Sequence, residues 1–302
     1  MVQMVSKAVI PVAGLGTRML PATKAIPKEL LPVYDRPIIE HVVREAIAAG
    51  MTEIILVTRS GKEAIENHFD AHFELEHRLD QKGKESVLSS IKDILPRSIK
   101  VSSIRQHDAL GLGHAVLCAS HLVGSEPFAV LLPDVLVLDK TARSNGYSFK
   151  CLADAWNRTG VAQIMVEPVA EEDVEKYGII DTANQDHEFF TPFMSQGVVE
   201  KPSRETAPSN LAVLGRYVLP NQVMELLENT PAGAGGEIQL TDALNVLAKK
   251  GDLGAFKTDA ATYDCGNKGG FLAANIAVGM RDEATRAYVQ DRFNGLDRFS
   301  EK

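Results

Sequence analysis

Short segments typical of strands alternate with stretches of helical periodicity along the first half of the chain. The predicted strands cover residues 8–13, 53–58, 99–105 and 128–132, of which 8–13 and 128–132 are apolar runs, and the helical stretches cover 37–50, 61–95 and 112–122. A nearly unbroken apolar run is typical of a strand that is buried on both faces of a parallel sheet. The alternation therefore predicts successive βαβ units, with the strand over 8–13 at the centre of the sheet.

The pattern becomes less regular after Val161. It indicates short strands around 177–180 and 197–202, a longer buried strand over 208–219, and helices starting within 236–244 and covering 269–293. We predict a single α/β domain over 1–302, with a Rossmann-like fold whose mixed, mostly parallel sheet is covered by helices. Its parts are a half over about 1–160, a second half over about 161–293 and a polar tail over 294–302.

A glycine-containing loop follows the first apolar run. Gly14 and Gly16 leave main-chain N–H groups free to close on an anion. The same segment adds a hydroxyl and two cations, from Thr17, Arg18 and Lys28. A tight turn with a few solvated charges is the ordinary alternative. The dinucleotide fingerprint is excluded because Met19 stands where a third glycine is needed, and no Gly-Lys-Ser/Thr completes a P-loop. The loop is therefore a candidate polyphosphate site of another type.

Two aspartates follow extended segments. Asp134 comes after the apolar run over 128–132, and Asp264 comes after Tyr263 and shortly before Gly266. Such an acid is about as often a helix cap or a turn residue as a ligand. The alternative is a hard-cation site, because magnesium usually takes one or two carboxylates and completes its shell with phosphate oxygens and water.

Two further polar groups are candidates for substrate contacts. Gln106 follows the predicted strand over 99–105, and its two-sided amide beside Gly111 is suited to reading a base edge. Glu200 and Lys201 precede a proline, where a solvated strand end is the simpler interpretation.

Composition limits the kinds of partner. The formal net charge is −8, which favours neither nucleic acid nor an anionic membrane surface. No apolar run approaches 18 residues, and we expect no signal peptide because residues 1–7 lead straight into the first apolar run. The three scattered cysteines form no CxxC motif and are expected to be reduced, in keeping with a cytoplasmic protein.

The glycine-containing segment carries a family resemblance. The run Gly14-Leu-Gly-Thr-Arg-Met-Leu-Pro-Ala-Thr-Lys-Ala-Ile-Pro-Lys-Glu-Leu-Leu-Pro32 closely resembles the signature of bacterial UTP–glucose-1-phosphate uridylyltransferases, also called UDP-glucose pyrophosphorylases. The resemblance continues to about Met280. It implies a nucleotide-diphosphosugar transferase fold with nucleotide on the first half and sugar on the second. The implied reaction converts UTP and α-D-glucose 1-phosphate into UDP-glucose and pyrophosphate, with Mg²⁺ as cofactor.

The resemblance also implies roles for individual residues. Catalytic roles fall to Arg18, Lys28 and Lys201. The nucleotide would be bound by Ala13, Gly14, Gly16, Thr17, Gln106 and Gly111. The sugar phosphate would be bound by Gly178, Glu200 and Lys201, and the magnesium ion by Asp134 and Asp264. Many relatives have a lysine just before Gly111, where this chain has Leu110, which puts only peripheral contacts in doubt.

Base selection is expected to depend on Gln106. If its amide pairs with the uracil edge through both of its polar groups, purines are excluded by shape and cytosine by a donor facing a donor. Thymine differs from uracil by a methyl group on another edge, so this glutamine does not reject it. We therefore expect strong discrimination against CTP and GTP, and weaker discrimination against dTTP.

Three alternatives to this enzyme remain. The first is a dTTP-dependent glucose-1-phosphate thymidylyltransferase, and the second a sugar-transferring enzyme, which would normally carry Asp-x-Asp where this chain has Asp134-Val-Leu136. The third is a non-catalytic homologue that binds sugar nucleotides, and such a protein should have lost Thr17, Arg18 or a metal aspartate. We expect a homo-oligomer, either a dimer or a tetramer, with small-molecule substrates.

Overall fold

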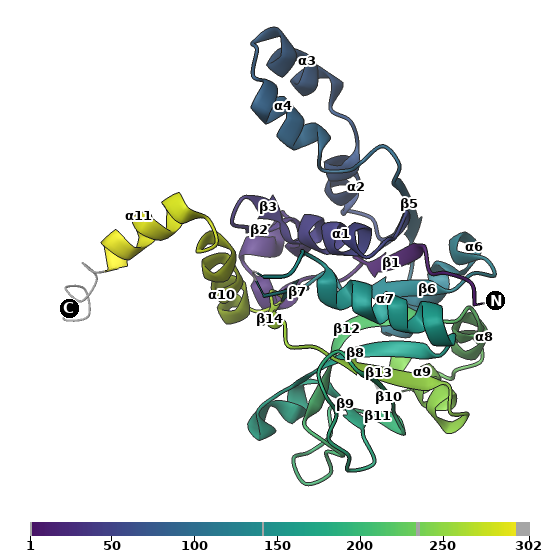
Figure 1. Ribbon diagram of the computed structural model, residues 1–302. Coiled ribbons are helices and arrows are strands. Elements are labelled where there is room, and N and C mark those ends of the chain that lie inside the picture. Colours follow the sequence, from purple (N-terminus) through teal and green to yellow (C-terminus); the bar gives the residue numbers. More distant parts are fainter. Residues whose placement is uncertain (1, 141, 234–235, 294–302) are drawn as a thin grey trace.

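The computed structural model describes residues 2–140, 142–233 and 236–293, so the predicted tail over 294–302 lies outside the described residues. Its centre is a mixed sheet of ten strands within those ranges (Figure 1). In sheet order these are β10 (Pro192–Met194), β13 (Leu253–Lys257), β8 (Ala162–Pro168), β12 (Leu211–Leu219), β6 (Phe128–Leu131), β1 (Lys7–Pro11), β4 (Glu53–Thr58) and β5 (Lys100–Arg105). The other two strands branch from this order: β9 (Gly178–Asp181) pairs with β12, and β11 (Gly197–Glu200) pairs with β9.

The parallel core of the sheet is the part that sequence periodicity predicted. Strands β6, β1, β4 and β5 are parallel neighbours, as are β8 and β13, whereas β12 runs antiparallel to both β6 and β8. The predicted α/β fold class is confirmed. Two small ribbons lie outside the main sheet, β2 (Pro32–Val33) with β3 (Arg36–Pro37), and β7 (Val135–Leu138) with β14 (Ala261–Asp264).

Helices cover both faces of the sheet, and further helices extend away from it (Figure 1). They are α1 (Ile38–Ala48), α2 (Glu63–Phe69), α3 (Phe73–Gln81), α4 (Glu85–Lys92), α5 (Gly111–Cys118), α6 (Ser120–Val123), α7 (Tyr147–Thr159), α8 (Gln222–Glu228), α9 (Leu240–Lys249), α10 (Lys268–Gly279) and α11 (Glu283–Phe293). Short 3₁₀ turns occupy η1 (Thr17–Met19), η2 (Ala22–Lys24), η3 (Lys28–Leu30) and η4 (Glu171–Lys176).

Alternate residues of β1 enter two separate cores. Val9 packs with residues of α5, α8 and α9 on one face, while Ala8 and Ile10 pack with residues of α1 and α7 on the other. All three side chains are completely buried. This two-faced burial is the physical origin of the unbroken apolar run, because successive strand residues point to opposite faces and here neither face meets water.

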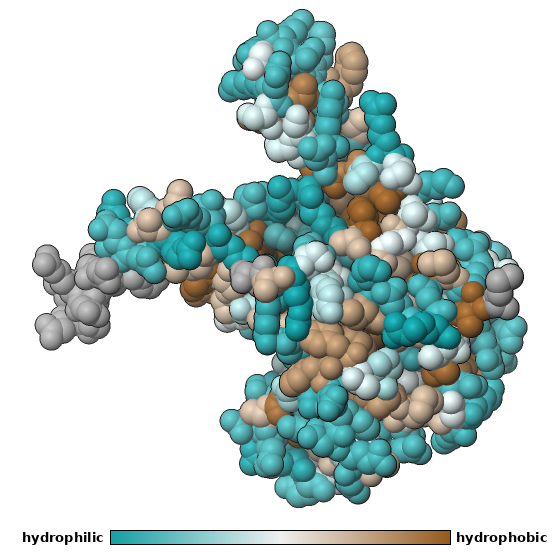
Figure 2. Space-filling view, viewed as in Figure 1, coloured by the Kyte–Doolittle hydropathy of each residue, from teal (hydrophilic) through white to brown (hydrophobic). Residues whose placement is uncertain are grey.

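Several predicted boundaries differ from the observed ones. The strand expected over 8–13 ends at Pro11, and the remaining two residues begin the loop. The helical stretch over 61–95 is three helices rather than one, and α10 and α11 divide the stretch over 269–293. The helix expected from 236–244 begins at Leu240. In Figure 1, α3 and α4 stand away from the sheet and α11 extends from the body, and Figure 2 shows that α3 and α4 are mostly hydrophilic.

Candidate active site

The loop after β1 is shaped by Gly16 and filled by Lys28. Gly16 has a positive φ of 69°, a left-handed conformation that favours glycine. A Cβ atom there would lie 3.2 Å from Cβ of Lys28, so the lysine stem packs across the loop. Thr23 fastens the turn, since its hydroxyl donates to the Gly16 carbonyl at 2.8 Å. Lys28 is thereby held beside the free main-chain groups around Gly14.

Two cations and two carboxylates converge next to this loop. Lys28 Nζ lies 2.6 Å from Asp134 Oδ2, and Arg18 lies 3.6 Å from Asp134 and 3.2 Å from Asp264. Burial raises the pKa of Asp134, but the attraction of Lys28 and Arg18 outweighs it and lowers the pKa below its usual range. Asp134 is therefore ionised at neutral pH, and Lys28 meets it as an ion pair.

The β7–β14 ribbon brings the two aspartates together although they are far apart in sequence. Asp264 pairs with Val135 in the register of the ribbon, and the Cys265 N–H donates to the Asp134 carbonyl at 2.8 Å. Gly266 follows closely, where a Cβ atom would lie 2.8 Å from an oxygen of each carboxylate. Glycine is needed at this position because a side chain would fill the space between the two acids.

This arrangement fits a hard divalent cation that is only partly held by protein. Within the described ranges, no group of three or more His, Cys, Asp or Glu side chains converges as a complete metal site. Two carboxylates that face each other across Gly266, where Arg18 now lies between them, are the donor set that magnesium uses when phosphate oxygens and water complete its shell. Asp134 and Asp264 are the residues that could hold it.

One cavity, of about 300 Å³, opens beside the glycine loop. It is lined by Ala13, Gly14, Lys28, Gln106, Gly111 and Asp134, among others. Gly111 begins α5 with a φ of 94°, and a Cβ atom there would lie 2.8 Å from Glu237 and 3.0 Å from the Ile238 carbonyl. Five of the predicted nucleotide and phosphate residues thus share one cavity with Asp134. Gly16 shapes the turn and Thr17 is exposed, and neither lines this cavity.

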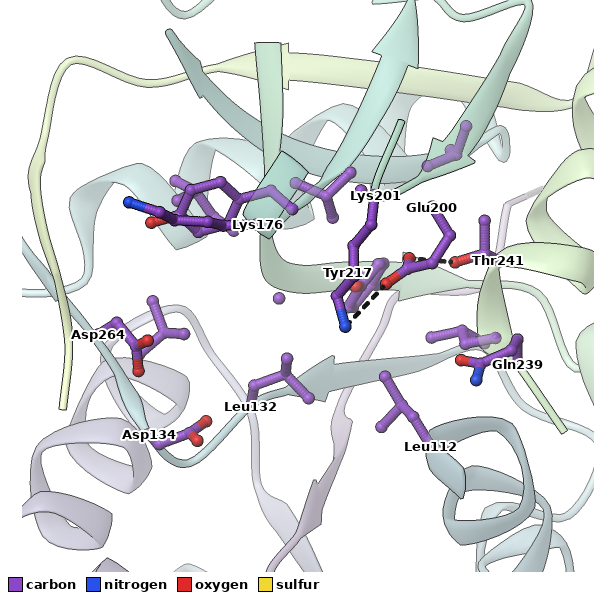
Figure 3. A pocket seen from close by; sticks show the side chains of 18 of the residues that line it. Leu112, Leu132, Asp134, Lys176, Glu200, Lys201, Tyr217, Gln239, Thr241 and Asp264 are labelled. Atoms are coloured by element: carbon purple, nitrogen blue, oxygen red, sulfur yellow. Dashed lines mark hydrogen bonds and ion pairs between the residues drawn. The ribbon is translucent and has the colours of Figure 1, made fainter. Parts of the chain in front are cut away.

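A second cavity, of about 470 Å³, adjoins the first, and Figure 3 shows its lining. It contains Arg18, Asp134 and Asp264 together with Gly178, Glu200 and Lys201. Glu200 is paired with Gly178 across β11 and β9, and the Thr241 hydroxyl donates to Glu200 at 3.2 Å. Asp134 and Leu132 line both cavities, so the two spaces meet at the charged cluster.

Several lining residues were not predicted from the sequence. They are Arg59 and Glu237 in the smaller cavity, and Glu167, Lys176, Tyr217, Gln239, Thr241 and Thr262 in the larger one. Glu167 accepts from Thr262, and burial raises the pKa of its carboxyl. Thr241 was not predicted because a polar residue in the first turn of a helix commonly forms hydrogen bonds only within that turn. Nothing in the local sequence shows that it reaches β11.

A family model and curated relatives match most of the chain. The model described as nucleotidyl transferase matches residues 7–280. The chain belongs to the nucleotidyl transferase family. It is 50% identical over 277 residues to proteins named UTP–glucose-1-phosphate uridylyltransferase from Haemophilus influenzae and Escherichia coli, covering 92% of this chain and 94% and 91% of theirs.

Solved structures agree with this nucleotidyl transferase in fold. A UDP-glucose pyrophosphorylase from Acinetobacter baumannii is 48% identical with a TM-score of 0.90, over 97% of this chain and all of that one. A further structure from that organism, described as UTP-bound, matches equally well. A UDP-glucose pyrophosphorylase complexed with UDP-glucose is 38% identical with a TM-score of 0.82, over 92% of this chain and all of that one. None of the helices that the structure describes could cross a membrane.

Proposed function

We propose that this nucleotidyl transferase transfers the uridylyl group of UTP to α-D-glucose 1-phosphate and releases pyrophosphate. The observation that carries the proposal is the meeting of two cavities at Asp134. The smaller cavity has the size and lining for a nucleotide, and the larger one offers Glu200 and Lys201 to a sugar phosphate. Relatives at 48–50% identity carry this activity in their names and favour UTP over the thymidylyl alternative.

The chemistry needs positioning and charge neutralisation rather than a base. An oxygen of the sugar phosphate attacks the α-phosphorus in line, the bond from that phosphorus to the bridging oxygen breaks, and pyrophosphate leaves with the electron pair. The attacking phosphate is already ionised at neutral pH. Arg18 and Lys28 would neutralise the triphosphate and the departing pyrophosphate, and Lys201 would orient the attacking phosphate.

Asp134 and Asp264 are the proposed magnesium ligands. A bound Mg²⁺ would reduce the repulsion between the two anionic substrates. Lys28 and Arg18 are in contact with these carboxylates in the structure and would be available to phosphate oxygens once a divalent cation neutralises the acids.

The remaining assignments follow the two cavities. Nucleotide binding falls to Ala13, Gly14, Gln106 and Gly111 in the lining, with Gly16 and Thr17 shaping and closing the phosphate loop. Sugar binding falls to Gly178, Glu200 and Lys201. The nucleotide half over about 1–160 and the sugar half over about 161–293 are proposed on this basis, with Glu237 reaching from the second half into the nucleotide cavity.

We further propose a cytoplasmic homo-oligomer, either a dimer or a tetramer. The three cysteines are unpaired thiols, as is typical of a reducing compartment. Leu272 and Ile276 lie four residues apart on α10 and are 61% and 48% exposed, which favours a contact between subunits. Light scattering of the purified protein tests this, since a strictly monomeric species would contradict it.

The decisive experiment is pyrophosphate release with glucose 1-phosphate and magnesium, measured with each nucleoside triphosphate in turn. Rapid release with UTP, accompanied by UDP-glucose, is the expected result. A faster reaction with dTTP would favour the thymidylyltransferase. Binding of UDP-glucose without any turnover would favour the non-catalytic homologue.

A further inference from the structure

Both hydrogens of the Gln106 side-chain amide are engaged by the protein. Nε2 donates to the Gly111 carbonyl at 3.2 Å and lies 3.0 Å from Nδ1 of His114. An amide nitrogen carries two donor hydrogens and accepts no hydrogen bond, so Nδ1 of His114 must be the acceptor. The imidazole proton then resides on its Nε2, which lies 3.9 Å from Cys118 Sγ.

The amide oxygen of Gln106 is therefore the group left for a ligand. Gln106 is only 9% exposed and lines the nucleotide cavity. Within the described part of the chain, no hydrogen bond ends on its Oε1. This differs from the expectation that both polar groups of the amide pair with the base, because only an acceptor faces the cavity.

The neighbours also resist the opposite orientation of the amide. A half-turn about the last side-chain bond would place Oε1 against the Gly111 carbonyl, which can only accept, and would leave that carbonyl without a donor. The flipped oxygen could be satisfied by His114 only if the ring carried its proton on Nδ1, so the proton position on His114 distinguishes the two orientations. The Gly111 carbonyl is a main-chain group, so a side-chain substitution cannot remove this acceptor, whereas a substitution of His114 can remove the other. His114 is half-buried on α5 and does not line the cavity. Its contact with a residue of the cavity lining is the one to Gln106 Nε2.

We propose that His114 is a positioning residue that determines base specificity, by holding the Gln106 oxygen toward the nucleotide. Uracil presents an N3–H donor to that oxygen, whereas cytosine presents an N3 lone pair, so the fixed acceptor selects UTP over CTP. Thymine carries the same N3–H as uracil, so His114 does not separate UTP from dTTP. The proposal rests on the uridylyl transfer proposed above.

The test compares kcat/KM for UTP, CTP and dTTP in wild type, His114→Leu and His114→Asn. Leucine removes the acceptor, and the UTP/CTP ratio should fall about three- to tenfold, the effect of one neutral hydrogen bond. The UTP/dTTP ratio should stay constant. Asparagine offers Oδ1 near the position of Nδ1 and should restore the UTP/CTP ratio. His121→Leu on α6, an exposed histidine outside both cavities, is the matched control and should leave all ratios unchanged.

An unchanged UTP/CTP ratio in a folded His114→Leu protein overturns the proposal, as does an equal loss with all three nucleotides. If that variant does not fold, His114→Ala removes the same acceptor and carries the same prediction. Nitrogen-15 NMR of the histidine rings gives a readout independent of turnover: the proposal requires Nδ1 of His114 to be unprotonated in the free enzyme, and a protonated Nδ1 contradicts it. Failure of the wild type to turn over UTP would count against the proposed function and not against the ring assignment.

Discussion

Two cations stand against the Asp134 carboxylate before any substrate binds. The lowered pKa of Asp134 means that its carboxylate stays charged at neutral pH, and Lys28 Nζ forms an ion pair with its Oδ2 at 2.6 Å. We expect Asp134→Asn and Asp264→Asn each to lower kcat by at least about 10²-fold, because each removes one of two carboxylates that would hold the metal. Binding of Mn²⁺, followed by electron paramagnetic resonance, should weaken in parallel.

Asp259→Asn is the matched control for these two variants. Asp259 is also held by two cations, Lys140 and Arg143, but lines neither cavity. It should keep wild-type metal binding and turnover. Undiminished wild-type turnover in a strong chelator would exclude the metal assignment altogether.

Lys28 is placed to respond to charge that moves during the reaction. It borders the glycine loop and contacts Asp134, so its ammonium group can stabilise the negative charge that develops on the departing pyrophosphate. We expect Lys28→Ala to lower kcat by roughly 10²–10³-fold, with a smaller effect on the KM for UTP. Steady-state kinetics separate the two effects. A raised KM at unchanged kcat would mean that the lysine binds ground and transition states equally.

At the scale of elements, β12 anchors the turn that carries Asp134. Arg216 is completely buried and donates to the Leu132 carbonyl at 3.1 Å and to the Val135 carbonyl at 2.6 Å. Its guanidinium also forms a two-point ion pair with Glu45 of α1, at 2.9 and 2.8 Å. One side chain thus ties both ends of the Leu132–Val135 turn to the sheet and to a helix.

The double variant Glu45→Met/Arg216→Met tests this anchor without leaving a lone buried charge. Removing both partners of a buried pair is often tolerated, whereas removing one costs about 3–5 kcal/mol. The double variant should fold and bind Mn²⁺ more weakly, since the turn is no longer held. Lys7→Met is the control, because Lys7 similarly caps the Leu122 and Val123 carbonyls away from the site. Equal metal affinity in both variants would contradict an anchoring role.

At the scale of the whole molecule, Glu40 joins three elements. It bonds to Arg44 of its own helix α1, to Arg36 of β3 and to His68 of α2. Burial raises the pKa of Glu40, but these bonds outweigh it and lower the pKa from its usual 4.5 to about 2. Because the pKa is lowered on folding, Glu40 stabilises the protein above pH 4.5, and the contribution is lost as the pH falls toward about 2.

We therefore expect Glu40→Gln to reduce the free energy of unfolding at neutral pH by on the order of 2–3 kcal/mol, and to reduce its dependence on pH in the acid range. Denaturant unfolding at neutral and acid pH measures both quantities. Glu74→Gln is the comparison, since Glu74 and Arg78 form an exposed pair on α3 that contributes little. Equal acid sensitivity in wild type and Glu40→Gln would contradict this account.

Local sequence determined much of this protein. The apolar run around Val9 predicted a central buried strand because side chains alternate between faces, and the Gly14–Arg18 motif predicted both the loop and the family. The predictions that were wrong concern the ends of elements. Gly83, with a φ of 63°, falls in the break between α3 and α4 that helical periodicity over 61–95 could not place.

Only the tertiary structure decided which side chains meet. Asp134 and Asp264 become neighbours because β7 and β14 pair, Thr241 reaches Glu200 because α9 packs beside β11, and the Gln106 amide is oriented by His114 and Gly111. These contacts depend on strand order, register and side-chain direction, which hydrophobic periodicity does not encode. Backbone conformation and burial follow from neighbours in sequence, whereas a binding site depends on neighbours in space.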